Sequence, residues 1–142
     1  MKQSIFGFGS ATYDAAGGEE GIRQLVDRFY QLMASRDAYR VIWSWHPNDN
    51  AVSRDKLARF LCGWMGGPRR YQEKYGSINI PAVHAHLAVD EKARNAWLDC
   101  MSEALDTMPY SDELKRYLLV QLAKPAERIR AECESRDLCT GD

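Results

Sequence analysis

Apolar residues return every three or four positions in four separate segments of this chain, which is the spacing of one face of an α-helix. The first segment lies at 22–33, the second at 57–65, the third at 93–108 and the fourth at 114–122. None of them shows the strict alternation of apolar and polar residues that is typical of a half-buried strand. The sequence therefore predicts an all-α fold.

Local signals indicate where three of these helices begin and end. Ser53 is a candidate N-cap for the second helix, and Gly66-Gly67-Pro68 is a strong terminator for it. The third helix is expected from about Asp90 to Met108, where Pro109 closes it. Ser111 is then a candidate N-cap for the last helix.

A length of 142 residues is that of one ordinary domain, large enough for a core and an enclosed ligand. We expect one domain over residues 1–142, with a short N-terminal extension at about 1–12 and a frayed polar tail after about 133. Residues 38–52 and 77–89 show no sustained apolar stripe, so they are expected to form short helices or loops.

Charge and hydropathy exclude several kinds of partner. The formal net charge is −1, and basic and acidic residues are mixed along the chain, so neither nucleic acid nor an anionic membrane surface is expected as a partner. No stretch approaches the ~20 apolar residues that a membrane helix needs, and the N-terminus lacks the apolar run of a secretory signal. We therefore expect a cytoplasmic protein.

The four cysteines form no Cys-x-x-Cys pair, and two of them, Cys62 and Cys100, fall inside apolar helical segments. Free cysteine behaves as a small hydrophobe in such positions, so we interpret these residues as reduced and structural. The alternative is a zinc site in which His84 and His86 join these two cysteines, although the spacing matches no usual zinc module.

The most informative motif is a spaced set of residues in the second half of the chain. Gly66-Gly67-Pro68 is followed after three residues by Tyr71, after five more by Gly76, after eight more by His84 and after thirteen more by Trp97. This spaced set resembles the signature of the group II truncated haemoglobins. In that family the histidine binds haem iron and the tryptophan lies over the ligand side of the haem.

The resemblance covers most of the chain, from about Tyr13 to the last helix. Phe29-Tyr30 resembles the family's pair on its second helix, and Trp45-His46-Pro47 resembles the turn that brings another polar side chain over the haem. Residues 60–68 resemble the end of its distal helix. The resemblance implies a truncated globin fold, a two-over-two helical sandwich around one haem b.

The resemblance also implies which residues hold the haem. The iron ligand would be His84, and propionate partners at the pocket mouth would be Lys56 and Tyr71. The distal ligand pocket would contain Tyr30, His46, Ser53, Leu57 and Trp97. Further apolar contacts with the porphyrin would come from Phe60, Leu87, Val89 and Met101.

The segment before the expected iron ligand departs from the family pattern. The family usually carries an arginine where this chain has Val83, and Pro81 restricts the backbone nearby. His86 is a second imidazole only two residues from His84, and on a regular helix the two rings would point about 200° apart. We therefore expect His84, and not His86, to bind the iron.

The function that follows is reversible binding of oxygen or another small ligand such as carbon monoxide, nitric oxide, sulfide or peroxide. A donor-rich distal pocket would slow oxygen release, so NO detoxification or peroxidase-like chemistry with a reductase partner is a further hypothesis. The sequence does not indicate whether the protein is an enzyme. It also does not indicate whether the protein is a monomer or a homodimer.

Two other classes of function remain as alternatives. One is a haem-based sensor that signals through its surface, although we expect a single domain with no fused output domain. The other is a globin-fold interaction module with weakened or lost haem binding, an idea motivated by Pro81 and Val83.

Overall fold

The computed structural model describes residues 6–46, 49–76 and 90–140, with residues 132–140 described by their backbone only. Every regular element within these ranges is helical, so the prediction of an all-α fold is confirmed. The elements are α1 (Ala11–Ala15), α2 (Gly18–Ser35), the short 3-10 helix η1 (Asp37–Tyr39), α3 (Arg40–Ser44), α4 (Ala51–Trp64), α5 (Arg70–Tyr75), α7 (Glu91–Asp106) and α8 (Asp112–Thr140).

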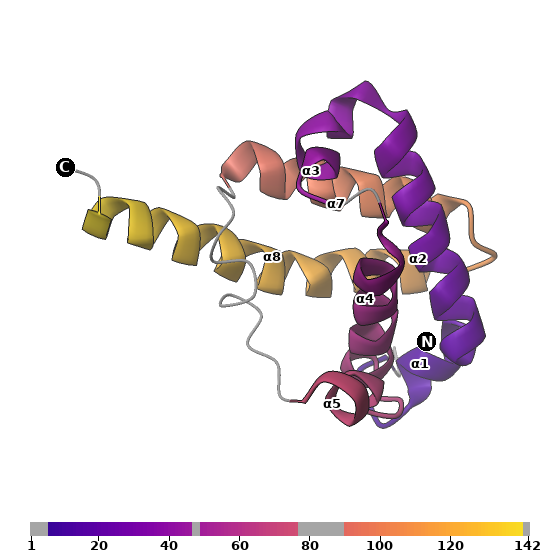
Figure 1. Cartoon of the computed structure of the whole chain (residues 1–142). Coiled ribbons are helices and arrows are strands. Elements are labelled where there is room, and N and C mark those ends of the chain that lie inside the picture. The colour runs from indigo at the N-terminus through magenta and orange to yellow at the C-terminus, as the bar shows by residue number, and fades with distance from the viewer. Residues whose placement is uncertain (1–5, 47–48, 77–89, 141–142) are drawn as a thin grey trace.

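The long helices form two pairs that lie across each other. Helix α2 packs against α4, and α7 packs against α8, while α2 also contacts α7 and so joins the two pairs. In Figure 1 the first pair stands upright and the second runs across the view. The short connection at residues 107–111 makes α7 and α8 antiparallel. The two-over-two arrangement expected from the sequence is therefore confirmed.

The core lies where these helices meet. Each long helix buries most or part of the apolar stripe that its sequence period predicts, and full burial of one large apolar side chain contributes about 1.5–3 kcal/mol. The buried side chains include Ile22, Leu25, Val26, Phe29 and Met33 of α2, Leu61 and Cys62 of α4, Cys100, Met101 and Leu105 of α7, and Leu114, Leu118 and Leu122 of α8.

Most of the predicted helix ends are observed. Helix α4 ends at Trp64, and Gly66 follows with φ of 92°, a conformation that glycine adopts without strain. The Asp90 side chain accepts a hydrogen bond from the Ala93 amide at 2.8 Å at the start of α7. Ser111 Oγ accepts one from the Leu114 amide at 3.1 Å, so the predicted cap of the last helix is confirmed.

The prediction that Ser53 caps the second long helix is wrong. Helix α4 already begins at Ala51, which places Ser53 inside its first turn. The side chain of Asp49 accepts a hydrogen bond from the Ala51 amide at 3.1 Å, so an acceptor further upstream satisfies one of the first free amides.

The structure tests the prediction of short helices or loops for one of the two segments without a long apolar stripe. Residues 38–52 contain η1, α3 and the start of α4, in line with the expected short helices. Residues 77–89 lie outside the described residues. Helix α8 continues to Thr140 with Pro125 inside it, past residue 133, after which the polar composition predicts fraying.

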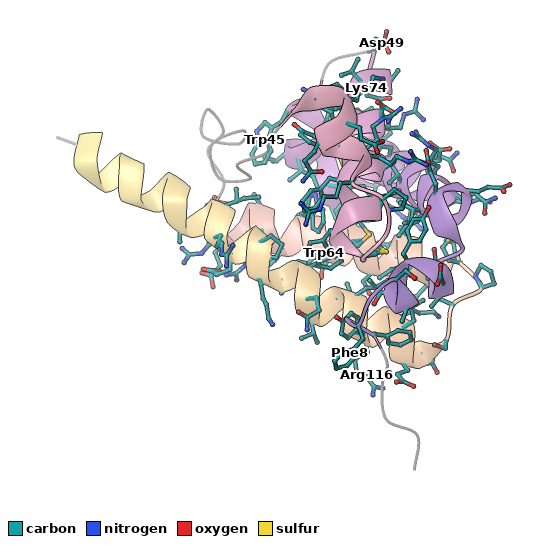
Figure 2. The ribbon with its side chains drawn as sticks, turned by 90° about the horizontal axis from the view of Figure 1, so that it is seen from below. Phe8, Trp45, Asp49, Trp64, Lys74 and Arg116 are labelled. Atoms are coloured by element: carbon teal, nitrogen blue, oxygen red, sulfur yellow. The ribbon has the colours of Figure 1, made fainter. Side chains whose placement is uncertain are left out.

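The N-terminal segment is fastened to α1 and α8. The Gly7 amide donates to Thr12 Oγ1 at 2.9 Å, and the Phe6 ring lies 5.5 Å from the Tyr117 ring. Figure 2 shows Phe8 beside Arg116, at the edge of the molecule. Among the described helices none is both long enough and apolar enough to cross a membrane.

Candidate functional site

Tyr30 is a buried tyrosine on α2, the helix that contacts both α4 and α7. It belongs to the core stripe of α2, and only 5% of its surface is exposed. Burial raises the pKa of Tyr30 to about 12, and the nearby positive charge of Arg54 offsets only part of this rise. The hydroxyl therefore stays neutral at ordinary pH and keeps a proton that it can donate.

His46 follows α3 and lies against Tyr30. The two ring centroids are 5.2 Å apart and the ring planes meet at 77°, an edge-to-face contact. The Nδ1 atom of His46 lies 3.0 Å from the carbonyl oxygen of Ile42, and because a carbonyl only accepts, Nδ1 carries the proton. In a neutral His46 the Nε2 atom is therefore an acceptor, and it becomes a donor only when the imidazole is protonated.

Trp97 reaches the same region from α7. Its ring lies edge-on to Phe29 with 5.2 Å between centroids, and Phe29 lies 5.7 Å from Tyr30. Trp97 is half-buried, whereas Phe29 is 1% exposed. The structure thus joins Tyr30, His46 and Trp97 through ring contacts: Phe29 touches Trp97 and Tyr30, and Tyr30 touches His46.

Helix α4 presents a second apolar face besides the one that it buries in the core. Ser53, Leu57, Phe60 and Trp64 recur at intervals of four, three and four residues, so they share one face of the helix. All four are partly buried, and the three apolar ones pack against the edge of the core. A partly covered apolar face of this kind suits a flat hydrophobic ligand.

Trp64 lies in the apolar segment 57–65, but it was not among the haem contacts that the family resemblance implied. Its position seven residues after Leu57 was the signal that could have placed it on the same face of α4. Figure 2 shows Trp64 where α4 meets α8, and there it lines a hollow of about 120 Å³ together with Tyr117 and Gln121.

The two expected propionate partners both contact Tyr75 of α5. Lys56 is exposed, and its ammonium nitrogen lies 5.3 Å from the centre of the Tyr75 ring. Tyr71 is buried, and its ring lies 5.2 Å from that of Tyr75. Lys74 also lies 5.3 Å from the Tyr75 ring, so two cations face one aromatic side chain.

Sequence reasoning missed Asp55, the hub of the polar contacts around this site. Burial alone would raise the pKa of Asp55, but four hydrogen bonds to its carboxylate outweigh burial and hold that pKa well below its usual range. These bonds join α2, α4 and α5. They come from Tyr75 at 2.6 Å, Lys74 at 2.9 Å, Arg23 at 3.0 Å and Arg59 at 2.9 Å.

The buried cysteines behave as the sequence predicts. Cys62 and Cys100 are free thiols, and burial raises the pKa of Cys100 to about 12. The Cys100 thiol donates to the Phe29 carbonyl oxygen at 3.4 Å, so it supports the aromatic cluster as a neutral group. Within the described ranges, no three histidine, cysteine or acidic side chains gather closely enough to hold a metal ion.

Part of the expected site lies outside the residues that the structure describes. The expected iron ligand His84, its neighbour His86, and the expected haem contacts Leu87 and Val89 all lie in residues 77–89. Met101, the remaining expected contact, is fully buried on α7.

The described half of the site fits a haem in its chemistry. The half-buried apolar face of α4 matches a flat macrocycle, and an exposed lysine at its margin matches a propionate. The neutral Tyr30 hydroxyl and the Trp97 indole supply donors that match a small polar ligand.

Comparison with known proteins points in one direction. The family model for bacterial-like globins matches residues 11–131. The group 2 truncated hemoglobin YjbI of Bacillus subtilis is 32% identical over 128 residues, which cover 90% of this chain and 94% of that protein.

Solved structures agree with the sequence matches. The group II 2-on-2 hemoglobin of Agrobacterium tumefaciens superposes with a TM-score of 0.80 at 26% identity, covering 91% of this chain and 96% of that one. The cold-adapted truncated hemoglobin of Pseudoalteromonas haloplanktis gives 0.80 at 28% identity, covering 83% and 95%. The truncated oxygen-avid haemoglobin of Bacillus subtilis gives 0.75 at 33% identity, covering 84% and 98%.

Proposed function

This chain belongs to the bacterial-like globin family, and within it to the group II truncated haemoglobins, and we propose that it binds oxygen or another diatomic ligand at a haem b held by His84. Haem-based binding of small ligands follows from family membership. The sequence contains no Cys-x-x-Cys-His motif that would attach haem covalently, which favours haem b.

The observation that carries the proposal is the buried, neutral hydroxyl of Tyr30 beside His46. When bound, the haem would supply an iron atom to which a diatomic ligand can bind. Tyr30 and the Trp97 indole N–H would donate to that ligand, and each such bond would contribute about 0.5–1.5 kcal/mol net. Because ~1.4 kcal/mol is tenfold in a rate or equilibrium constant, oxygen release should be slow.

His46 has a different part in this proposal from the one that the family pattern implies. Its Nδ1 proton is committed to the Ile42 carbonyl, so the neutral ring orients Tyr30 and does not itself donate to the ligand. Support for tight oxygen binding also comes from the similar Bacillus subtilis protein, which is described as oxygen-avid.

Three sets of side chains would hold the haem. Leu57, Phe60 and Trp64 would contact one face, in keeping with their partly buried positions on α4. Lys56 and Tyr71 would bind the propionates. The sequence-based contacts Leu87, Val89 and Met101 would complete the pocket, and Ser53 would border it.

A second candidate function is redox detoxification, either of nitric oxide or of peroxide, with a reductase partner. The observation that favours it is the presence of two oxidisable rings, Tyr30 and Trp97, on either side of Phe29. An NO-consumption assay on the oxygenated protein tests the first of these reactions, and absence of turnover would remove it.

The primary proposal is tested by adding hemin to the purified protein and recording the visible spectrum. A Soret band, followed by slow oxygen release from the reduced protein in a stopped-flow experiment, is the expected result. Haem binding with fast oxygen release would contradict the role of the distal donors, and no haem binding would contradict the proposal as a whole.

A further inference from the structure

Five aromatic rings form a continuous chain of contacts from the expected ligand pocket to α3. Trp97 lies 5.2 Å from Phe29, Phe29 lies 5.7 Å from Tyr30, and Tyr30 lies 5.2 Å from His46. His46 in turn stacks on Trp43, with 6.0 Å between centroids and 27° between the ring planes. Each ring is therefore in contact with the next.

The members of this chain differ in redox chemistry. Indole and phenol rings give up one electron more readily than phenyl or imidazole rings. Trp97, Tyr30 and Trp43 are thus the sites that can be oxidised, while Phe29 and His46 fill the gaps between them. Every gap between oxidisable rings is bridged by one aromatic side chain.

A basic side chain also lies in contact with Tyr30, whose oxidation releases a proton. A phenol loses its proton when it is oxidised, and the buried Tyr30 hydroxyl cannot release it directly to water. The ring that contacts Tyr30 is the imidazole of His46, and because its Nδ1 atom donates to the Ile42 carbonyl, Nε2 is the unprotonated nitrogen of the neutral ring. His46 is therefore a basic side chain in ring contact with Tyr30.

The Trp43 end of this series of aromatic rings lies near solvent. Phe29 is 1% and Tyr30 5% exposed, whereas Trp43 is only half-buried and lies on the short helix α3 beside the exposed Val41. The sequence drew attention to His46 but not to Trp43, three residues earlier. Exposure thus rises from Phe29 and Tyr30 towards both ends, Trp43 and Trp97, and Trp97 is the end at the expected ligand pocket.

We propose that Trp43 is the surface site at which a small phenolic reductant delivers electrons to the distal pocket after hydrogen peroxide has oxidised the haem. The inference rests on the proposed haem function. Hydrogen peroxide takes two electrons and two protons and becomes two molecules of water. A bound haem would supply the two-electron chemistry of this reduction, and Trp97, Tyr30 and Trp43 would return the electrons one at a time.

Each return step balances. Trp43 gives one electron inward and its indole proton to solvent, and a phenol then restores it with one electron and one proton. Two phenols become two phenoxyl radicals for every peroxide consumed, and the protein ends unchanged. Without a phenol, the oxidation should remain on Trp43.

Trp45 provides a matched control for Trp43. This tryptophan is also half-buried and lies two residues further on, but among the described residues no ring contact joins it to the aromatic chain. Trp45, labelled in Figure 2, packs against the edge of the core. Trp45→Phe removes an indole of the same kind and leaves the ring contacts intact.

The test treats the haem-loaded protein with one equivalent of hydrogen peroxide in the absence of reductant. Electron paramagnetic resonance and peptide mass mapping then locate the oxidised side chain, and phenol oxidation is measured separately. We expect oxidation at Trp43 in the wild type and in Trp45→Phe. Trp43→Phe should lose that signal and oxidise phenol several-fold more slowly, and His46→Leu should lower Trp43 oxidation by breaking the stack.

The Soret and carbon monoxide spectra of every variant separate the two claims. Failure of the wild type to bind hemin would contradict both the haem function and this inference. A normal spectrum with no oxidation at Trp43, or equal phenol oxidation by wild type and Trp43→Phe, would overturn this inference alone.

Discussion

The ring of Tyr30 meets the imidazole of His46 edge-on, with 5.2 Å between their centroids. His46 cannot turn freely, because its Nδ1 atom bonds to the Ile42 carbonyl at 3.0 Å and its ring stacks on Trp43. The contact joins the middle of α2 to the end of α3, so the residue that follows α3 helps to hold the buried Tyr30 ring in place.

Tyr30→Phe should speed oxygen dissociation by about tenfold, because it removes one donor worth about 1 kcal/mol or more to the ligand. Carbon monoxide dissociation should change much less, since that ligand is nearly apolar. Stopped-flow ligand replacement measures both rates. Tyr117→Phe, which alters a half-buried tyrosine that packs on Phe6, is the control and should leave them unchanged.

Trp97→Phe should also speed oxygen dissociation, because phenylalanine can keep the ring contact with Phe29 but lacks the indole N–H. Combined with Tyr30→Phe, the effects should not add fully, since both side chains address one ligand. Equal changes in the oxygen and carbon monoxide rates would show that Trp97 acts by shape and not as a donor.

Asp55→Asn should lower the free energy of unfolding near neutral pH. The free energy of unfolding of the variant should then change less than that of the wild type as the pH is lowered. The folded-state pKa of Asp55 lies below the unfolded value of about 3.9, so its stabilisation is present above that pH and is lost as pH falls further. Urea unfolding between neutral and acidic pH measures this.

The control for that experiment is Asp37→Asn. Asp37 pairs with Arg40 at 3.2 Å, but its side chain is 94% exposed, and such a pair contributes little. Identical acid profiles for Asp55→Asn and the wild type would show that the hub does not stabilise the fold.

Gly66→Ala should destabilise the protein by about 1–3 kcal/mol, because an L-residue is strained at this backbone conformation. The φ angle is 92°, and an added Cβ would lie 1.9 Å from the Gly9 carbonyl oxygen. Gly63→Ala is the control, since its nearest neighbour would be 3.4 Å away. A helical glycine of that kind gains about 0.5–1 kcal/mol on change to alanine, and thermal unfolding distinguishes the two variants.

Features with a local signal were predictable from the sequence. The stop after Trp64 depends on Gly66-Gly67-Pro68, and the cap of α8 depends on Ser111 three residues before Leu114. The Ser53 cap failed for the same local reason, because Asp49 offers an acceptor further upstream.

Features made by distant partners were not predictable. Asp55 becomes a hub only because Arg23 approaches from another helix, 32 residues away, and α5 brings Tyr75. Trp43 and His46 are only three residues apart, a spacing typical of neighbours on one helix face, but their link to Tyr30 depends on the packing of α3 against α2. The family resemblance named Tyr30, His46 and Trp97, and the fold brings them together; their roles toward a ligand stay predictions.

The most direct test of the central claim is a hemin titration of three proteins followed by their Soret spectra. The wild type and His86→Ala should bind hemin and give the spectrum of a histidine-ligated haem. His84→Ala should lose that ligation and regain it when imidazole is added. The account would be contradicted if the wild type gave no Soret band with added hemin, or if His86→Ala alone abolished binding.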